Sequence, residues 1–368
     1  KFGGYWRTRW MTYSNTDGVD DGGAGTALVD TRSRIYYTAI LQDNLKFVNT
    51  FEMDATWGGG TYGDIGADGK DLEIKNSYAD FNLWNLNWTI GTQGFQWGRS
   101  GFLFDDDATG MKIIYRADNF IPAFYWVRAY EGGPNNTGNP GQDYDYYTAL
   151  VNFKMGNHQF VPYVSYLFAN SGGQGINGGT VGEEQALYYI GIDYNLKMDA
   201  LSLMATGIYN GGAVDDSVDA KGYLLDLVVK YSMGAFGIHG EALYATGDDN
   251  ATDNDQEAFI APEGSSYTWS EGYAKGSIDK SNFGGSKNIS NLMSFNLGAT
   301  YKASKTLKFK FDWWNINYAE DATGFGDSRD GNKDVGNEFS VVATWALLKS
   351  LNLDIVGAYM IAGDAYEP

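Results

Sequence analysis

Apolar and polar residues alternate along most of the chain. In the segment TLKFKFDWW at 306–314, for example, Leu307, Phe309 and Phe311 are separated by Lys308 and Lys310. A period of two is typical of a β-strand with two different faces. About seventeen segments of roughly ten residues follow this pattern, from FGGYWRTRWMTY near the start to LNLDIVGAYMIA near the end. The pattern predicts an all-β protein whose strands are long enough to cross the hydrocarbon of a bilayer at a tilt.

The connections between these segments alternate strictly in length. Short turns, such as 42–44 and 155–157, alternate with long, acidic, Gly-rich stretches. We expect the long connections at 14–30, 58–72, 100–109, 132–143, 171–184, 211–220, 248–290 and 320–335. Short turns on one rim and long loops on the other are typical of a bacterial outer-membrane barrel, with turns in the periplasm and loops outside. The predicted fold is a transmembrane antiparallel up-and-down β-barrel.

Two other all-β folds fit the sequence less well. A β-propeller needs four short strands and a recurring motif in each blade, and neither is present. A soluble sandwich or a pair of lipocalin-like barrels would hide the apolar faces inside and would have loops of mixed length at both ends. We therefore expect one outer-membrane barrel domain over 1–368.

Closure of this barrel requires one more strand than the pattern contains. Single-chain bacterial barrels normally have an even number of strands, whereas seventeen is odd. An open edge of unpaired backbone groups would be very unfavourable in lipid. We expect an eighteenth, closing strand after Pro368.

Composition and charge narrow the possible functions. The formal net charge of −20 disfavours binding to nucleic acid. No run of eighteen apolar residues is present, which excludes a helical membrane protein. The chain has no Cys, so it cannot attach haem covalently or hold an iron–sulfur cluster, and we predict neither a cofactor nor a metal. His158 and His239 lack a recognisable nucleophile beside them, so we do not predict an enzyme.

The first strands carry the clearest candidate pore-lining residues. Arg7 and Arg9 share the polar face of the first strand, and Arg32 and Arg34 share that of the second. We expect the four arginines to meet across the first hairpin. Glu52 and Asp54 on the third strand should lie beside Arg32 and Arg34 and neutralise part of their charge. A structural ladder and a solute-selecting patch both remain open.

Further charged residues on polar strand faces complete the predicted pore lining. Lys112, Arg116 and Arg128 form a second expected group, Lys308, Lys310 and Asp312 form a third, and Lys46 lies on the third strand. Opposed charges around a pore would create a transverse field that disfavours apolar solutes.

The acidic connections offer weaker candidates. Asp105, Asp106 and Asp107 form a possible cation site in a loop, as does the stretch 247–257, although neither has the spacing of a known calcium loop. The longest connection, 248–290, contains Tyr267, Trp269 and Tyr273. It could fold into the barrel mouth or project outward, and the sequence does not distinguish the two.

Two stretches of the first third resemble a known family. TRSRIYYTAILQDNLKFVNTFEMDATWG at 31–58 and NLNWTIGTQGFQWGRSGFLFDDDATGMKIIYR at 85–116 are similar to hairpins of the alginate-export-like porins. The resemblance implies an 18-stranded barrel with an Arg-lined lumen. It does not imply alginate as the cargo, because fold does not fix function.

The sequence thus predicts a passive diffusion channel for small polar or ionic solutes in the outer membrane of a Gram-negative bacterium, in contact with outer-membrane lipid and lipopolysaccharide. One alternative is a dedicated exporter of an anionic polysaccharide. Another is a structural barrel that sheathes a partner such as a cytochrome. A monomer and a homo-oligomer such as a trimer are both compatible with the pattern.

Overall fold

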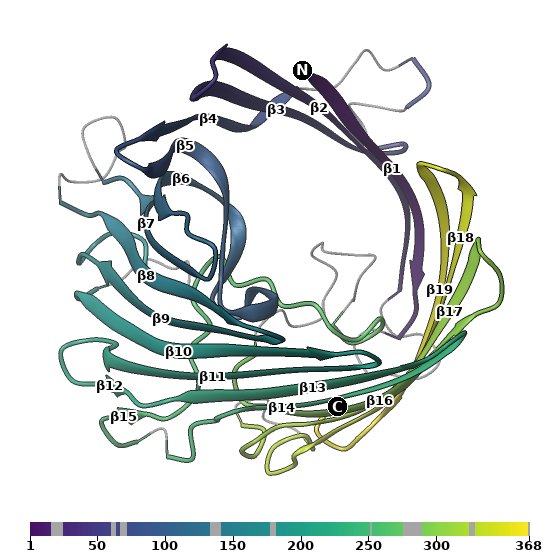
Figure 1. Ribbon diagram of the computed structural model, residues 1–368. Helices are drawn as coiled ribbons and strands as arrows, with labels where there is room; N and C mark the ends of the chain where they lie inside the picture. Colours follow the sequence, from purple (N-terminus) through teal and green to yellow (C-terminus); the bar gives the residue numbers. More distant parts are fainter. Residues whose placement is uncertain are drawn as a thin grey trace.

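The structure, a computed structural model, forms one continuous antiparallel sheet that curves into a wide barrel (Figure 1). It describes residues 1–15, 25–59, 64–66, 72–132, 141–176, 182–250, 252–274, 289–323 and 328–366. Each long strand pairs with the next long strand along the chain. The long strands are β1 (Phe2–Tyr13), β2 (Thr26–Gln42), β3 (Leu45–Thr56), β4 (Glu73–Leu83), β5 (Leu86–Trp97), β6 (Phe104–Tyr115), β7 (Phe120–Tyr130), β8 (Tyr144–Met155), β9 (His158–Ala169), β10 (Gln185–Met198), β11 (Leu201–Ala213), β13 (Tyr223–Met233), β14 (Phe236–Ala245), β16 (Leu292–Lys302), β17 (Leu307–Asn317), β18 (Asp334–Leu348) and β19 (Leu351–Ala362).

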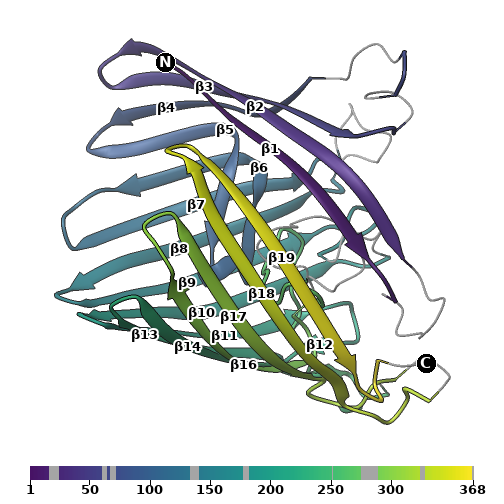
Figure 2. The same ribbon diagram turned by 90° about the vertical axis from the view of Figure 1, so that its right-hand side faces the viewer.

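The expected strand order is confirmed in the described residues. Nineteen strands are present, and two of them, β12 (Asp219–Ala220) and β15 (Asp255–Gln256), are two-residue strands that pair with each other in parallel. The remaining seventeen match the seventeen alternating segments. Short turns join them at one rim and longer connections at the other (Figure 2). At one of the two-residue turns, Trp84 and Asn85 have φ values of 55° and 60°, which suit a type I′ hairpin.

The outward face of the sheet is apolar over most of the barrel. On β13, Leu225 and Leu227 are 53% and 44% exposed, and exposed residues of β10 and β16, such as Ile192 and Leu297, are also apolar. Exposed aromatic residues lie toward both rims, for example Tyr147 and Tyr166 near the long connections and Phe153 and Phe236 near the short turns. Such a belt is unfavourable in water and suits a bilayer with aromatic girdles at its interfaces. No helix in the described part of the chain is long and apolar enough to cross a membrane.

The inward face differs from the expected polar lining over part of the wall. Inward residues at the long-loop ends of β8–β14 are apolar and buried, including Tyr146, Tyr163, Leu187, Tyr189 and Leu224. On these strands both faces are therefore apolar for part of their length. The reason is that two segments of the same chain fold into the barrel and pack against this part of the wall.

The first inward segment is the end of the β5–β6 hairpin, residues 92–109, with the short 3-10 turn η1 (Arg99–Gly101) at its tip (Figure 1). The β4–β5 ladder ends at Ser77 and Thr92, and β6 pairs with β7 only as far as Thr109. Just before this point Gly91 faces Gly110 in the register, and a Cβ on either would collide with a carbonyl oxygen of the adjacent strand. Glycine at both positions lets the hairpin turn away from the wall.

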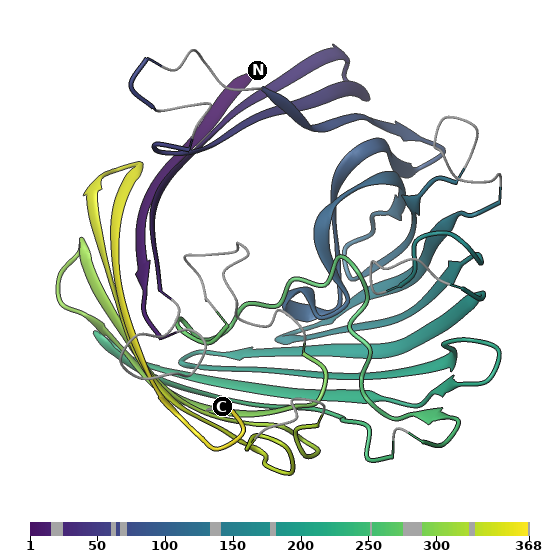
Figure 3. The same cartoon turned by 180° about the vertical axis from the view of Figure 1, so that it is seen from behind.

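The second inward segment, residues 256–274, is called the insert here. It runs through the barrel interior along the β8–β17 side (Figure 3). The buried Glu338 carboxylate accepts the backbone N–H groups of Glu271 and Tyr273 at 2.9 and 2.8 Å, and the rings of Trp269 and Trp314 lie 4.9 Å apart. In its described part, the connection 248–290 therefore folds into the barrel, which decides between the two directions that the sequence left open.

The first and last strands leave a seam in the described part of the barrel. β1 and β19 run in the same direction, and no ladder joins them there (Figure 2). A strand antiparallel to both would fit between them and would satisfy both edges. The closing strand expected after Pro368 falls outside the described residues and stays a prediction.

The lipid-facing role of the outer belt can be tested by adding a charge. We expect Leu227→Arg, halfway along β13, to lower the free energy of unfolding by about 2–4 kcal/mol, because the guanidinium would face hydrocarbon. Met233→Arg, on the same face of the same strand but at its short-turn end, should cost only about 0–1 kcal/mol. Denaturant unfolding from lipid vesicles, followed by Trp fluorescence, measures both. Equal losses would contradict a lipid-facing belt.

Candidate functional site

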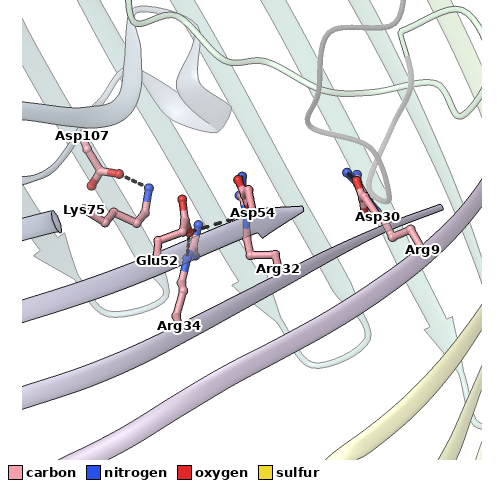
Figure 4. A network of polar contacts seen from close by, with 8 residues as sticks. All are labelled: Arg9, Asp30, Arg32, Arg34, Glu52, Asp54, Lys75 and Asp107. Atoms are coloured by element: carbon pink, nitrogen blue, oxygen red, sulfur yellow. Dashed lines mark hydrogen bonds and ion pairs between the residues drawn. The ribbon is translucent and has the colours of Figure 1, made fainter. Parts of the chain in front are cut away.

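A row of charged side chains follows the inner face of the first four strands. Arg9, Asp30, Arg32, Arg34, Glu52, Asp54 and Lys75 come from β1–β4, and Asp107 comes from the inward hairpin (Figure 4). We call these eight residues the charged row. They come from the side of the barrel formed by β1–β4, whereas the insert runs along the β8–β17 side (Figure 1).

The antiparallel register explains the pairs within the row. Arg32 lies opposite Asp54, and Arg34 lies opposite Glu52. Arg32 Nε donates to Asp54 Oδ1 at 2.6 Å, and Arg34 Nε donates to Glu52. The expected neutralisation of these two arginines is confirmed. The side chains of Arg32 and Asp54 are still 29% and 41% exposed, so they face the solvent in the lumen rather than a packed core.

Arg9 has a different partner from the one expected. It lies opposite Asp30, and its Nε donates to Asp30 Oδ1 at 3.0 Å. Of the four arginines expected to meet across the first hairpin, Arg7 and Arg32 lie directly opposite each other, whereas Tyr5 lies opposite Arg34. The sequence interpretation placed Asp30 in a long loop, whereas β2 begins at Thr26, so the pairing was missed.

Arg7 is distinct from the other arginines of this wall. It lies opposite Arg32 in the β1–β2 register. In the described part of the chain, its guanidinium forms no ion pair, and its buried Nε has no hydrogen-bond acceptor. A half-buried arginine without a carboxylate partner, next to a second arginine, attracts anions that pass along the lumen wall.

Acidic residues of the hairpin lie across from this wall. Asp105, Asp106 and Asp107 belong to strand β6 and not to a loop, so the predicted loop cation site is wrong in its placement. The Asp107 carboxylate already accepts hydrogen bonds from Lys75 and, at 2.7 Å, from Asn76 Nδ2. The hairpin carboxylate is thus joined directly to the charged residues of β4, and the expected transverse field stays a prediction.

Three carboxylates within the described residues could approach a cation together. Ligand oxygens of Glu52, Asp54 and Glu73 lie within 4.8 Å of one another. Two of the three are already paired with Arg34 and Arg32. The cluster is thus better explained by its arginines than by a metal ion.

The other predicted pore-lining residues lie apart from this row. Lys46 Nζ pairs with Asp80 at 2.8 Å near the short-turn rim. Lys310 Nζ lies 3.0 Å from Asp312, as expected for the third group, and 3.3 Å from Glu271 of the insert. Lys308 is exposed near the short-turn rim, opposite Thr344.

The second expected group is not brought together. Lys112 Nζ lies 4.6 Å from the centre of the Phe95 ring, and Arg116 donates to Asn87 at 3.1 Å near the short turns. Arg128 is on the opposite face of β7 from the fully buried Val127, and it pairs with Asp145 at 2.8 Å. The prediction that Arg128 lines the pore is therefore wrong. Strand alternation places it on the outer surface near the long-loop rim.

Arg99, at the tip of the inward hairpin, is a functional residue that the sequence interpretation missed. Its guanidinium pairs with Asp226 of β13, and its Nε donates to Thr206 Oγ1 of β11 at 3.0 Å. Thr206 in turn donates to Asp193 of β10 at 2.9 Å. The Arg99 side chain is 11% exposed and that of Asp226 is fully buried. The hairpin tip is therefore attached to the opposite wall by a buried ion pair.

The insert closes the space beside this tip. Asp105 N–H donates to Gly264 O at 2.8 Å, and Tyr189 of the wall donates to Ile260 O at 2.9 Å. Burial, opposed by the Gln174 amide, raises the pKa of the Glu263 carboxyl in the insert above its usual value. Hairpin, insert and wall form one packed cluster. The side chains of Arg32 and Asp54 in the charged row lie outside this cluster and are partly exposed.

Comparisons with solved structures agree on the architecture. A BenF-like porin from Pseudomonas fluorescens Pf-5 is 12% identical, with a TM-score of 0.61, and the match covers 97% of this chain and 92% of that one. OccK8 (OprE) of Pseudomonas aeruginosa is 10% identical, with a TM-score of 0.59 and coverages of 99% and 93%. OpdK of Pseudomonas aeruginosa, solved with vanillate, is 12% identical, with a TM-score of 0.57 and coverages of 99% and 92%.

The chain has the porin fold. No model of a known protein family matches it, and no curated protein sequence does. At these identities the likeness concerns architecture alone, so the function has to be argued from the charged row and the inward segments.

The attachment of the hairpin can be tested through Arg99. We expect Arg99→Gln to raise the rate of amide hydrogen exchange in residues 93–108 by about a hundredfold or more, because removing one partner of a buried ion pair typically costs about 3–5 kcal/mol. Arg116→Gln, whose side chain donates a hydrogen bond to Asn87 near the short turns, is the matched control. Unchanged exchange in the Arg99 variant would mean that packing alone holds the tip.

Proposed function

We propose that this chain is a channel of a Gram-negative outer membrane, through which small polar or ionic solutes diffuse passively. The observation that carries this proposal is the asymmetric interior. One part is a packed cluster, and the other part is lined by solvent-exposed charged groups within an apolar outer belt. Such a barrel needs neither energy input nor a covalent step to select solutes, because width and wall charge suffice.

The porin fold of the solved relatives supports this proposal, and the charges refine it. OpdK was solved with vanillate, which carries a carboxylate. In this chain Arg7, unpaired in the described residues, lies beside Arg32 along the lumen. We infer that small solutes with one carboxylate are favoured over cations at this point of the passage.

The alternatives receive less support from the same residues. The resemblance to alginate-export-like porins favours a polysaccharide exporter, yet the arginines at 9, 32 and 34 are each paired with a carboxylate of the same wall. A polyanion would have to displace those carboxylates. A sheath around a partner such as a cytochrome would need a wide lumen, and the insert and hairpin occupy part of it.

Planar-bilayer recording separates the three functions. We expect discrete channels whose current is proportional to salt concentration and is not blocked by alginate. Small currents that alginate blocks would favour the exporter, and absence of current from folded protein would favour a sheath. The heat-dependent shift in gel mobility of folded barrels provides the control for folding.

The role of Arg7 is tested by ion selectivity. We expect Arg7→Gln to shift the reversal potential in a salt gradient toward cation selectivity, because one unpaired positive charge is lost from the lumen wall. Arg9→Gln should shift the potential in the same direction but less, since Asp30 already neutralises Arg9 locally. If the reversal potential shifts in neither variant, Arg7 and Arg9 do not contribute to ion selectivity and have a structural role only.

A further inference from the structure

The insert has little regular structure of its own and depends on other parts of the chain for its attachment. Residues 257–274 contain neither a helix nor a strand, so their backbone groups need partners from elsewhere. The middle of the insert is held by the hairpin tip, where Ser266 N–H donates to Gly101 O at 3.0 Å. Its end, residues 267–274, lies against β17 and β18. The insert thus bridges the hairpin tip and this part of the wall.

Glu338 is the wall residue that holds this end of the insert. Its side chain is fully buried on the inner face of β18, opposite Trp314 of β17. Its Oε1 accepts the N–H of Glu271 at 2.9 Å, and its Oε2 accepts the N–H of Tyr273 at 2.8 Å. Both oxygens of one carboxylate are thus used by two backbone groups of the insert. Hydrogen bonds to a charged acceptor are roughly twice as strong as neutral ones.

The wall itself does not require a carboxylate at this position. In the described part of the chain, no Lys or Arg side chain pairs with Glu338. A buried carboxylate without a cation is unfavourable unless hydrogen bonds compensate it. The insert supplies those bonds, and water in the lumen would supply them if the insert moved away. The side chain therefore serves the attachment of the insert rather than the stability of the sheet.

We propose that Glu338 is a positioning residue that holds the insert inside the lumen and thereby sets the size limit of the passage. This inference rests on the proposed channel function and adds to it the residue that fixes the width. Because the insert bridges the hairpin tip and the wall, release of its end would let residues 267–274 move within the interior. Larger solutes would then pass.

The close fit around Gly272, which lies between the two N–H donors, supports a fixed position for this end. A Cβ at Gly272 would lie 3.2 Å from Ala358 Cβ and 3.2 Å from Glu338 Oε2. Lys310 Nζ, 3.3 Å from the Glu271 carboxylate, adds an ion pair beside the anchor. The insert therefore contacts β17, β18 and β19 within a few residues of Gly272.

Substitution of the carboxylate tests the anchor. Glu338→Gln keeps the shape of the side chain but replaces one acceptor oxygen with an NH2 group that faces an N–H donor. We expect amide hydrogen exchange at 271 and 273 to rise at least tenfold, and the largest neutral polyethylene glycol that enters the pore to increase. Asp354→Asn, at an inner-face carboxylate of β19 that accepts from Thr344 at 2.6 Å, is the matched control and should change neither. Unchanged exchange in Glu338→Gln, or faster exchange with an unchanged size limit, overturns the proposal.

A reversible disulfide distinguishes release of the insert from misfolding, and the chain has no native Cys to interfere. Gly272→Cys and Ala358→Cys, added to Glu338→Gln, place two Cβ atoms 3.2 Å apart, close to the range of about 3.5–4.5 Å in disulfides. We expect oxidation to restore the original size limit and reduction to release it again. A pore that stays wide after oxidation contradicts the proposal.

The two kinds of measurement also separate this inference from the channel function. An unmodified protein that forms no channel would refute the proposed function and the size limit together. The exchange rates of Glu338→Gln and Asp354→Asn would still decide whether Glu338 holds the insert, because they do not depend on current.

Discussion

Backbone hydrogen bonding in the absence of water is the constraint on which the rest of this structure depends. A polypeptide that crosses hydrocarbon has to pair its N–H and C=O groups internally, and an antiparallel sheet that closes on itself does so without exposed edges. The wall of this barrel is correspondingly regular: each long strand pairs with its successor, and only small bulges interrupt the registers. The interior has no such requirement, because loops there can hydrogen-bond to the wall, to each other or to solvent. The variation that determines function is therefore confined to the interior.

The sequence predicted what this constraint imposes on the wall. The alternation of apolar and polar residues predicted the strands and the two rims. It also predicted that Arg32 and Arg34 pair with Asp54 and Glu52, because the register follows once two neighbouring strands and the short turn between them are known. The errors arose where a strand leaves the regular pattern. Asp30 was missed because β2 extends into a Gly-rich stretch that resembled a loop. Arg128 was assigned to the lumen from its charge, although strand parity places it beside Trp126 on the outer surface.

The contacts that shape the lumen could not have been found in this way. Arg99 and Asp226 are far apart in the sequence, and no local pattern links a turn residue to a mid-strand carboxylate. The apolar inward residues, such as Tyr146 and Tyr189, resembled ordinary strand residues, because their partners, Glu263 and Ile260, lie in a connection without periodicity. The signal that was available is the pair Gly91 and Gly110, opposite each other in one hairpin, since two glycines facing across a ladder mark a point where backbones approach closely.

The attachment of the hairpin tip also bears on the order in which the barrel assembles. Local pairing can form the β5–β6 hairpin early, but the Asp226 carboxylate that holds its tip belongs to β13 and is available only after several more strands have been added. The insert, which contacts the hairpin through Gly264 and Ser266, follows β13 and β14 in the chain. The hairpin tip therefore gains its ion-pair partner only once the chain has been paired as far as β13, which makes the shape of the passage depend on strands remote from the hairpin in sequence.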